Sequence, residues 1–357
     1  FRDVMQETAP LLDVLIVGAG ISGIGCAYHI QKKYPDLSYS IIEARGDLGG
    51  TWDLFKYPGI RSDSDLFTFG YEFKPWKEKK AIADGRSIKA YVEETAAENG
   101  IKERIRFLTR VVDINWQSDK NYWRVTLKSE ESGQHEHIVA RWIFNASGYY
   151  RYDKGYAPHF KGQSQFNGQI VHPQHWPEDL EYENKRVVVI GSGATAVTLV
   201  PALAKSASHV TMLQRTPSYV LPVPVDDPIA KHLRAWFSED TAFKAARWFN
   251  IAKQRWVYAF CQRFPHRARK IIRSLNAKML PEGYPVDIHF NPPYNPWEQR
   301  PCAVPGGDLF ESISKGKASV ATDTIETFTE TGIKLDSGQH IEADIIVTAT
   351  GLNLLPL

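Results

Sequence analysis

Short apolar runs alternate with helical segments through much of this chain. Such runs are rich in β-branched residues and too short for helices, so each predicts a strand buried in a parallel sheet. The expected strands are residues 12–17, 39–42, 142–144, 187–190, 209–213 and 341–347. A helical stretch follows the first strand as far as Ile30, and strands that alternate with helices indicate an α/β fold. From Asp226 to about Leu280 the pattern becomes helical.

A glycine-rich loop follows the first strand and opens the first helix. Its sequence is Gly18-Ala19-Gly20-Ile21-Ser22-Gly23. In such a loop Gly18 permits the tight turn, Gly20 lets a pyrophosphate approach the backbone, and Gly23 lets the helix pack on the strand. The phosphates are expected at the helix N-terminus, where free N–H groups and the helix dipole favour an anion. The candidate contacts of this loop are therefore Gly18, Gly20, Ser22 and Gly23.

Glu43 ends the second strand, twenty residues after Gly23. A carboxylate at this place accepts hydrogen bonds from ribose hydroxyls and repels a 2′-phosphate, so it favours FAD or NAD over NADP. The alternative is a glycine-rich turn that binds no ligand. The strand before the loop and the glutamate after it argue against that alternative.

A second phosphate loop follows the strand at 187–190. Its candidate contacts are Gly191, Ser192, Gly193, Ala194, Thr195 and Ala196. Ala196 replaces the third glycine, which the pattern tolerates because alanine still allows close packing. The next strand ends in Arg215 and Thr216, without an acid. Because a guanidinium can bind a 2′-phosphate through two hydrogen bonds, this site predicts NADPH, although Arg215 could instead be a solvated surface charge. Two different dinucleotides suggest hydride transfer from NADPH to FAD.

Composition narrows the class of protein. The 357 residues carry a net charge of only +2, so net charge gives no argument for a nucleic-acid partner. The cysteines Cys26, Cys261 and Cys302 form no C-x-x-C pair, which argues against a disulfide framework and against a flavin disulfide reductase. No metal site is expected. No secretory signal or membrane span is evident, so a cytoplasmic location is the expectation.

Residues 166–177, between the two loops, carry a specific motif. Phe166, Gly168, His172, Trp176 and Pro177 fit the pattern F-x-G-x-x-x-H-x-x-x-W-P. The chain thereby resembles Baeyer–Villiger monooxygenases, which are class B flavoprotein monooxygenases. The resemblance implies an enzyme that uses FAD, NADPH and O₂ to convert a ketone to an ester through a C4a-peroxyflavin. It also implies that His172 governs domain movement and contact with NADP rather than chemistry.

The resemblance assigns further site residues. The loop after Gly49-Gly50, with Thr51, Trp52 and Asp53, would run beside FAD, while Val111 and Val112 would contact the adenine through their backbone unless they are ordinary strand valines. The segment Tyr57-Pro58-Gly59-Ile60-Arg61-Ser62-Asp63 would place Arg61 near the cofactor and Asp63 near the flavin. Arg300 would be the catalytic arginine, held by Asp63, because a permanent positive charge stabilises the anionic peroxide and the adduct that follows. Many family members have Lys-Arg where this chain has Gln299-Arg300, so this chain lacks one cation that the resemblance implies as a contact to NADP.

The helical segment from 231 to 280 is basic and rich in aromatic residues. The favoured interpretation is a helical insertion that packs on the NADP domain and lines the substrate entrance, and peripheral contact with anionic lipid is the alternative. Nucleic-acid binding would need a motif that is lacking. Tyr57 to Trp76 and Tyr294 to Phe310 are most similar to the ethionamide-activating and long-chain ketone monooxygenase subgroup, which implies ketone or thioether substrates.

The expected architecture is two Rossmann-like dinucleotide-binding domains, for FAD and NADP, with a helical insertion in the second. The predicted segments are an FAD domain at 1–150, the first part of the NADP domain at 151–225, the insertion at 226–298, the NADP return at 299–335 and a return to the FAD domain at 336–357. Relatives are expected to continue beyond the Ala349-Thr350-Gly351 motif, so this chain looks truncated. Two alternatives remain, an N- or S-oxygenating flavin monooxygenase and an inactive nucleotide-binding fragment.

Overall fold

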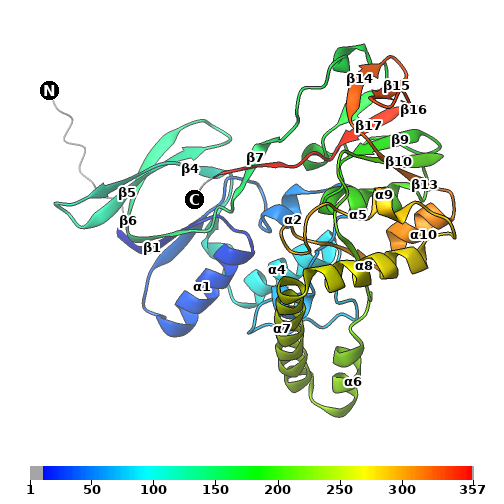
Figure 1. The fold of residues 1–357 in the computed structure, drawn as a ribbon. Helices are drawn as coiled ribbons and strands as arrows, with labels where there is room; N and C mark the ends of the chain where they lie inside the picture. Colours follow the sequence, from blue (N-terminus) through cyan, green and yellow to red (C-terminus); the bar gives the residue numbers. More distant parts are fainter. Residues whose placement is uncertain (1–10, 356–357) are drawn as a thin grey trace. The chain divides into compact units, whose positions relative to one another are not determined.

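The computed structural model describes residues 11–355, and its chain divides into two compact units (Figure 1). Unit 1 comprises the described part of Phe1–Leu54 together with Arg86–Tyr150 and the residues from Leu354 onward. Unit 2 comprises Phe55–Gly85 and Arg151–Asn353. The first ten residues of the expected FAD domain and the last two of its expected return lie outside the described residues.

Unit 1 is built on a six-stranded sheet with the order β3-β2-β1-β6-β5-β4. The first four strands in this order are parallel, whereas β5 and β4 continue the sheet as an antiparallel extension. Leu15, Ile42 and Val125 belong to its buried core. The elements are β1 (Leu11–Val17), α1 (Ile21–Lys33), β2 (Tyr39–Ile42), α2 (Thr51–Leu54), α4 (Gly85–Glu98), η1 (Lys102–Arg104), β3 (Ile105–Arg106), β4 (Thr109–Gln117), β5 (Tyr122–Ser129) and β6 (His135–Asn145).

Unit 2 contains a five-stranded parallel sheet with the order β13-β10-β9-β17-β8. A small antiparallel sheet, β14-β15-β16, packs beside it around the buried Phe166, Phe328 and Ile346. The elements up to residue 223 are β7 (Tyr150–Gly155), which begins at the boundary of the units, α3 (Leu66–Phe69), η2 (Gln163–Gln165), β8 (Gln169–Val171), η3 (Pro173–His175), β9 (Arg186–Ile190), α5 (Ala194–Leu203), β10 (His209–Gln214) and β11 (Val220–Val223).

The rest of unit 2 begins with the segment 226–298, where the sequence predicts a helical insertion. This segment holds the helices α6, α7 and α8 and the short α9, and the 25-residue α7 is the longest of these four. The elements are α6 (Pro228–Trp236), α7 (Glu239–Arg263), α8 (Pro265–Met279), α9 (Val286–His289), β12 (Cys302–Pro305), α10 (Asp308–Ser314), β13 (Ala318–Thr322), β14 (Ile325–Thr329), β15 (Gly332–Leu335), β16 (His340–Glu342), β17 (Ile345–Thr348) and β18 (Leu352–Leu354).

The structure differs from the sequence-based segments in two places. The late strand expected at 341–347 is two strands, and β17 pairs with β9 and β8 in unit 2 instead of returning to unit 1. All four residues of β17 are buried, and an apolar strand of this kind fits any parallel sheet, so its pattern could not select the sheet. Residues 55–85, expected in the first domain, group with unit 2 because they pack on α5 and α7.

The described residues hold neither a membrane-spanning helix nor a cluster of metal-binding side chains. No helix within residues 11–355 is long and apolar enough to cross a membrane. In the same residues, His, Cys, Asp and Glu side chains do not gather in groups of three or more that could hold a metal ion.

Candidate dinucleotide sites and the Arg300 loop

The first glycine loop of unit 1 is shaped by two close backbone approaches. Gly18 has φ +104°, and a Cβ atom there would lie 2.5 Å from the carbonyl oxygen of Ala146, while a Cβ on Gly23 would lie 1.9 Å from the carbonyl oxygen of Gly18. By contrast, a Cβ on Gly20 would meet nothing closer than Gly50 Cα at 3.7 Å. The outer two glycines are therefore required by the fold itself, whereas Gly20 leaves open space beside the loop.

Helix α1 begins at this loop without a capping side chain. Its N-cap is Gly20, which makes no side-chain cap hydrogen bond, and the first turn holds no acid, although Ser22 lies there exposed. Such a terminus presents the positive end of the helix dipole. This arrangement suits a phosphate, as the sequence predicts.

Glu43 is buried against the same loop. It is 7% exposed, and its two oxygens accept hydrogen bonds from the backbone N–H of Ala19 at 2.8 Å and of Arg45 at 2.9 Å. The carboxylate thus fixes the loop and retains further lone pairs for another donor, because an ionised carboxylate offers about four acceptor positions.

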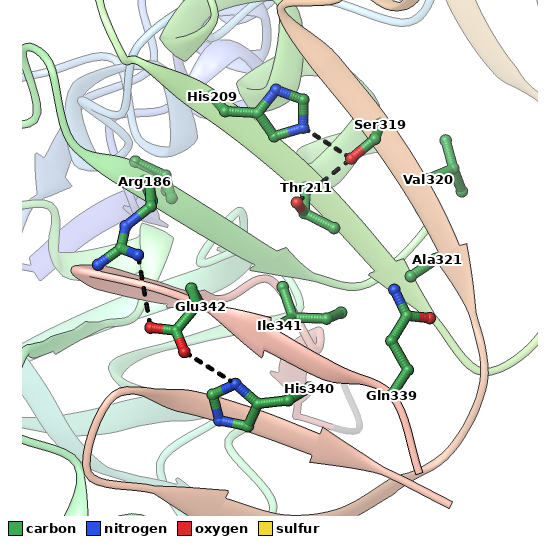
Figure 2. A pocket seen from close by; sticks show the side chains of 11 residues that line it. Arg186, His209, Thr211, Ser319, Val320, Ala321, Gln339, His340, Ile341 and Glu342 are labelled. Carbon is green, nitrogen blue, oxygen red and sulfur yellow. Dashed lines mark hydrogen bonds and ion pairs between the residues drawn. The ribbon is translucent and has the colours of Figure 1, made fainter. Parts of the chain in front are cut away.

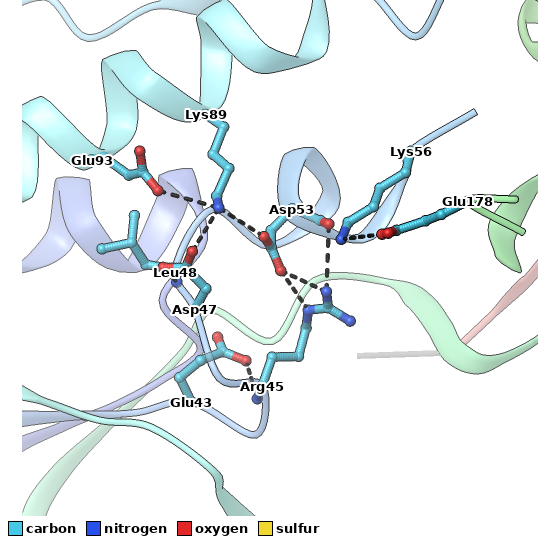
Figure 3. A network of polar contacts seen from close by, with 9 residues as sticks. All are labelled: Glu43, Arg45, Asp47, Leu48, Asp53, Lys56, Lys89, Glu93 and Glu178. Carbon is cyan, nitrogen blue, oxygen red and sulfur yellow. Dashed lines mark hydrogen bonds and ion pairs between the residues drawn. The ribbon is translucent and has the colours of Figure 1, made fainter. Parts of the chain in front are cut away.

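A polar network surrounds Asp53 after the Gly49-Gly50 turn (Figure 3). Asp53 forms ion pairs with Arg45 at 2.5 Å and with Lys89 at 2.9 Å, and Lys89 also binds Asp47 at 2.6 Å. Burial opposes the ionisation of Asp53, but the hydrogen bonds from Arg45 and Lys89 outweigh it and lower the pKa of this carboxyl. Asp53 is therefore engaged within the protein and fixes the turn that carries Thr51 and Trp52.

Val111 and Val112 lie on β4, away from this network in the sequence. Val111 packs against the core of unit 1, whereas Val112 is 43% exposed. Sequence reasoning missed Arg45 and Lys89, because neither belongs to a short motif.

The second loop, in unit 2, repeats the geometry of the first. Gly191 has φ +135°, and a Cβ there would lie 2.4 Å from the carbonyl oxygen of Ala349. A Cβ on Gly193 would meet nothing within 4 Å. Gly193 is also the N-cap of α5, which again lacks a side-chain cap at its start, Ala194 to Ala196. Ala349, in the Ala349-Thr350-Gly351 segment, thus lies against the first glycine of this loop. Ala146, in the Ala146-Ser147-Gly148 segment, lies in the same way against the first glycine of the other loop.

Arg215 and Thr216 follow β10 beside the second loop. The Ser192 hydroxyl donates to the carbonyl oxygen of Thr216 at 3.1 Å and lies 2.8 Å from the Ser218 hydroxyl, which ties the two segments together. Arg215 is exposed and forms no ion pair with any residue in the described part of the chain. An exposed guanidinium beside a phosphate loop is available to an anionic ligand.

The segment from Tyr57 to Asp63 packs on α5. The buried Tyr57 hydroxyl hydrogen-bonds Thr195, and burial raises the pKa of Tyr57 to about 12. Gly59 has φ +78°, and a Cβ there would lie 2.8 Å from Ala202 Cβ. The segment is therefore held against the helix that starts at the second loop.

Arg61 is engaged by an acid that sequence reasoning missed. Its guanidinium forms a two-bond ion pair with Asp308, at 2.5 and 3.3 Å, and Asp308 begins α10. The Nε atom of Arg61 is buried without a hydrogen-bond partner. Nothing in the local sequence could reveal this pair, because 247 residues separate its members.

Arg300 and Asp63 lie within electrostatic reach of each other in unit 2. Burial raises the pKa of Asp63, and the positive charges of Arg300 and Arg61 oppose this shift. The direct hydrogen bond of Arg300 goes to the Ser64 hydroxyl, at 3.0 Å, and not to Asp63. The structure thus brings the expected pair together but fixes the arginine through the neighbouring serine.

The loop before Arg300 is a constrained turn. Trp297 has φ +72°, an uncommon conformation for a bulky residue, and its ring packs edge-on against Tyr258. Asn295 accepts and donates hydrogen bonds with Glu298 across the turn. A backbone held in this conformation by its surroundings indicates a defined position for the arginine that follows.

The motif at residues 166–177 contacts two other segments of unit 2, one at Gly351 and one at Arg151 and Tyr152. His172 lies 3.2 Å from the carbonyl oxygen of Gly351, and the buried Gln174 side chain donates to the carbonyl oxygens of Arg151 and Tyr152 at 2.8 and 2.9 Å.

The other residues of this motif pack within unit 2. Phe166 is in the core, and a Cβ on Gly168 would lie 2.3 Å from the carbonyl oxygen of Asp344. Trp176 packs edge-on against Tyr182, and the carbonyl oxygen of Pro177 accepts from Leu180 N–H. Gln174 is a further residue that the sequence pattern missed.

A polar pocket of about 320 Å³ lies between β16 and three strands of the five-stranded sheet, β9, β10 and β13 (Figure 2). It is lined by the first residues of β9, by residues of β10 and β13, and by β16 with the preceding Gln339, whereas the glycine loop follows the end of β9. Its charged side chains are paired with one another, Arg186 with Glu342 at 3.4 Å and His340 with Glu342 at 3.1 Å. The pocket is therefore separate from the candidate dinucleotide site.

Comparison with known proteins agrees with this geometry. Residues 75–355 match the flavin-binding monooxygenase-like family, and residues 16–75 match an NAD(P)-binding Rossmann-like domain. The FAD-containing monooxygenase EthA of Mycobacterium tuberculosis is 56% identical over 344 residues, which span 96% of this chain and 70% of that protein. The probable FAD-binding monooxygenase AlmA of an Acinetobacter species is 50% identical over 96% of this chain and 69% of its own.

Solved structures show the same fold. An oxidised steroid monooxygenase bound to NADP aligns with a TM-score of 0.79 at 25% identity, over 97% of this chain and 72% of its own. A cyclohexanone monooxygenase bound to ε-caprolactone aligns with a TM-score of 0.76 at 22% identity, over 97% of this chain and 74% of its own, which shows the fold alone.

The fold defines an α/β protein of two Rossmann-like units, and the relatives define its family. The chain belongs to the flavin-binding monooxygenase-like family and is an enzyme. The resemblance to monooxygenases and the predicted fold class are thereby confirmed.

Proposed function

We propose that this enzyme is an FAD-dependent, NADPH-consuming monooxygenase of the Baeyer–Villiger type. In the balanced reaction a ketone, O₂, NADPH and a proton give an ester, NADP⁺ and water. Unit 1 binds FAD and unit 2 binds NADPH in this proposal. Thioether oxygenation to a sulfoxide is a second reaction that the same cofactors permit.

Unit 1 has the features that FAD requires. The pyrophosphate would approach the backbone at Gly20, where a side chain is absent and space is open, and would accept from the N–H groups at the start of α1. Glu43 would accept hydrogen bonds from the ribose hydroxyls with the lone pairs that Ala19 and Arg45 leave free. The network around Asp53 would hold the turn with Thr51 and Trp52 in place.

Unit 2 has the features that NADPH requires. Gly193 leaves open space at the start of α5, so a pyrophosphate would approach as it does in unit 1. Arg215 is exposed beside the loop, and a guanidinium binds a phosphate through two parallel hydrogen bonds. A 2′-phosphate there would distinguish NADPH from NADH.

Arg300 provides the positive charge that oxygen insertion needs. Bound flavin supplies the chemistry that reduces and activates O₂. Arg300 cannot lose its proton, so it would stabilise the negative charge that develops on the carbonyl oxygen of the substrate. Ser64 orients this guanidinium, and the carboxyl of Asp63 lies close enough to interact with its charge.

The single observation that carries this proposal is the placement of Arg300 beside Asp63 and Ser64, in the unit that holds the second glycine loop. The test is a panel of linear and aryl ketones and aryl thioethers, with NADPH oxidation followed by absorbance and products by gas chromatography. The expected result is one ester formed for each NADPH consumed with at least one ketone. Sulfoxide formation without any ester would identify an S-oxygenating monooxygenase instead.

A further inference from the structure

Helix α7 presents aromatic side chains to solvent. Trp248 is 74% exposed, Trp256 is 67% exposed and Phe249 is 41% exposed. Trp248, Ala252 and Trp256 are four residues apart, so they follow one line along the helix. We call Trp248, Phe249, Ala252 and Trp256 the aromatic stripe. Soluble proteins rarely expose contiguous large apolar patches without a function.

The opposite side of α7 anchors it firmly to the rest of unit 2. Phe243 and Ala246 are buried there, and Phe243 packs against Phe67. Arg247 donates to three backbone carbonyls around α3, those of Phe67 at 2.6 Å, Gly70 at 2.9 Å and Thr68 at 3.2 Å. Packing therefore fixes α7 through this side, and the exposed aromatic stripe lies on the opposite side of the helix.

The insertion also concentrates positive charge. From Lys231 to Lys278 there are twelve Lys and Arg and only two acids, Glu239 and Asp240, a net +10. Because the whole chain is +2, the remaining residues together carry −8. Arg255, on α7, and Lys270 and Lys278, on α8, are exposed and form no ion pair with the residues that the structure describes.

We propose that the aromatic stripe and the cations of α7 and α8 dock on the surface of an anionic lipid bilayer. Trp side chains favour the boundary between head groups and acyl chains, and a helix with an apolar face and a basic flank lies in that plane. Cations close to an anionic bilayer add an attraction that salt screens. The enzyme is thus a peripheral membrane protein that meets apolar substrates at the bilayer.

The arrangement favours a lipid surface over nucleic acid. Trp248 and Trp256 lie on one line along a convex helix surface, and Trp256 stacks on Phe260 in the same helix at a ring separation of 5.6 Å. A single-stranded nucleic acid needs a basic groove in which separate rings accept successive bases. An aromatic stripe on a convex helix surface can instead contact the flat surface of a lipid bilayer.

The test is vesicle flotation with the purified protein, with its flavin bound. Vesicles of phosphatidylglycerol and phosphatidylcholine should carry the protein upward, whereas pure phosphatidylcholine should carry much less. The double variant Trp248→Ser, Trp256→Ser should lose most of the binding. The variant Arg255→Glu, Lys270→Glu should bind anionic vesicles at least roughly 25-fold more weakly, because each cation near such a surface changes the partition coefficient about fivefold.

Matched controls separate this surface from general effects. Trp142→Ser removes a tryptophan that is 71% exposed in unit 1, and Lys205→Glu with Lys317→Glu makes the same charge change elsewhere in unit 2. Both controls should float like the unaltered protein. The proposal is overturned if the unaltered protein does not float with anionic vesicles, or if the stripe variants float equally well. It is also overturned if light scattering shows a dimer that the stripe variants convert to a monomer.

Discussion

The Nε2 atom of His172 lies 3.2 Å from the carbonyl oxygen of Gly351, while its Nδ1 atom accepts from the backbone N–H of Gln174 at 3.2 Å. Since Nδ1 is an acceptor, the proton of the neutral ring is on Nε2 and points to Gly351. Gly351 precedes β18, which pairs with β7, and these two strands contain two of the four places where the chain passes between the units. His172 therefore holds one of these connections in its neutral form.

This hydrogen-bonding predicts a dependence of stability on pH. Burial lowers the pKa of His172 below its ordinary value near 6.5, despite backbone hydrogen bonds to Gly351 and Tyr156. Below pH 6.5 His172 binds more protons in the unfolded chain than in the native state. Its contribution to the free energy of unfolding is therefore fully present above that pH and is lost as pH falls through the pKa of the folded state. His172→Gln should remove this component. Thermal midpoints at pH 7.5 and 5.5 should therefore differ less for the variant; an equal difference would contradict the assignment. Burial also lowers the pKa of His289, but this residue is present in both proteins, so it contributes equally to both differences in thermal midpoint.

Gly155 is expected to be intolerant of any side chain because of the same imidazole. A Cβ there would lie 2.1 Å from Cε1 of His172, although the backbone of Gly155 is not left-handed. Gly155→Ala should lower the free energy of unfolding by about 1–3 kcal/mol, as overpacking does. The double variant with His172→Ala should recover most of this loss, measured by urea denaturation. Gly46→Ala, whose Cβ would meet Leu108 at an ordinary 3.6 Å, is the matched control. Failure of the double variant to recover would show that the clash is not the cause.

The two glycine loops show what the sequence predicts well. Each loop combines a strand, three spaced small residues and a helix within one short stretch, so the pattern contains all the information that the local geometry needs. The structure places Gly18 and Gly191 in matching turns, each against the carbonyl oxygen of an alanine. β2 also has the bounds that its apolar run predicts.

Contacts between distant segments could not be predicted in this way. Arg61 pairs with Asp308, and Lys89 joins Asp47 and Asp53, but no periodicity or spacing relates these residues. The sheet that receives β17 is likewise decided by packing partners, because a fully buried strand has no polar face to orient it. Such features depend on the tertiary fold, which one sequence shows only indirectly.

The glycines of the second loop should separate stability from binding. Gly191→Ala forces a side chain into a left-handed conformation and against Ala349, so the thermal midpoint should fall by several degrees. Gly193→Ala meets open space in the protein, so the midpoint should not change. Because its methyl group would occupy the place of the pyrophosphate, the KM for NADPH should rise about tenfold or more, a loss of roughly 1.4 kcal/mol. An unchanged KM would remove NADPH from this loop.

Arg215 should determine the preference for NADPH over NADH. It is exposed, so Arg215→Ala should not alter the thermal midpoint. Hydrogen bonds to a charged group contribute about 1.5–3 kcal/mol, which predicts a KM for NADPH that is roughly 10- to 150-fold higher and a nearly constant KM for NADH. Arg215→Lys, which keeps the charge but not the two-bond geometry, should give an intermediate value. Equal losses for both nucleotides would contradict a contact with the 2′-phosphate.

Arg300 should act in oxygen insertion and not in flavin reduction. Removing a group that stabilises developing charge typically costs about 10²–10³ in rate, so Arg300→Ala should reduce ester formation to this extent. Flavin bleaching by NADPH, measured without oxygen in a stopped-flow instrument, should stay within a few-fold of the unaltered enzyme. Ester yield would be measured by gas chromatography in the same preparations.

Ser64 provides the control for Arg300, because its hydroxyl accepts the 3.0 Å hydrogen bond from the guanidinium. Ser64→Ala keeps the positive charge but loosens its position, and a hydrogen bond of this kind contributes about 1.5–3 kcal/mol at most. Its loss of ester formation should therefore be smaller than that of Arg300→Ala, while NADPH consumption continues and the excess reducing equivalents appear as hydrogen peroxide. Ester formation by Arg300→Ala at the unaltered rate would mean that another cation stabilises the reacting oxygen, and Arg61 would be the next candidate because it also lies within electrostatic reach of Asp63.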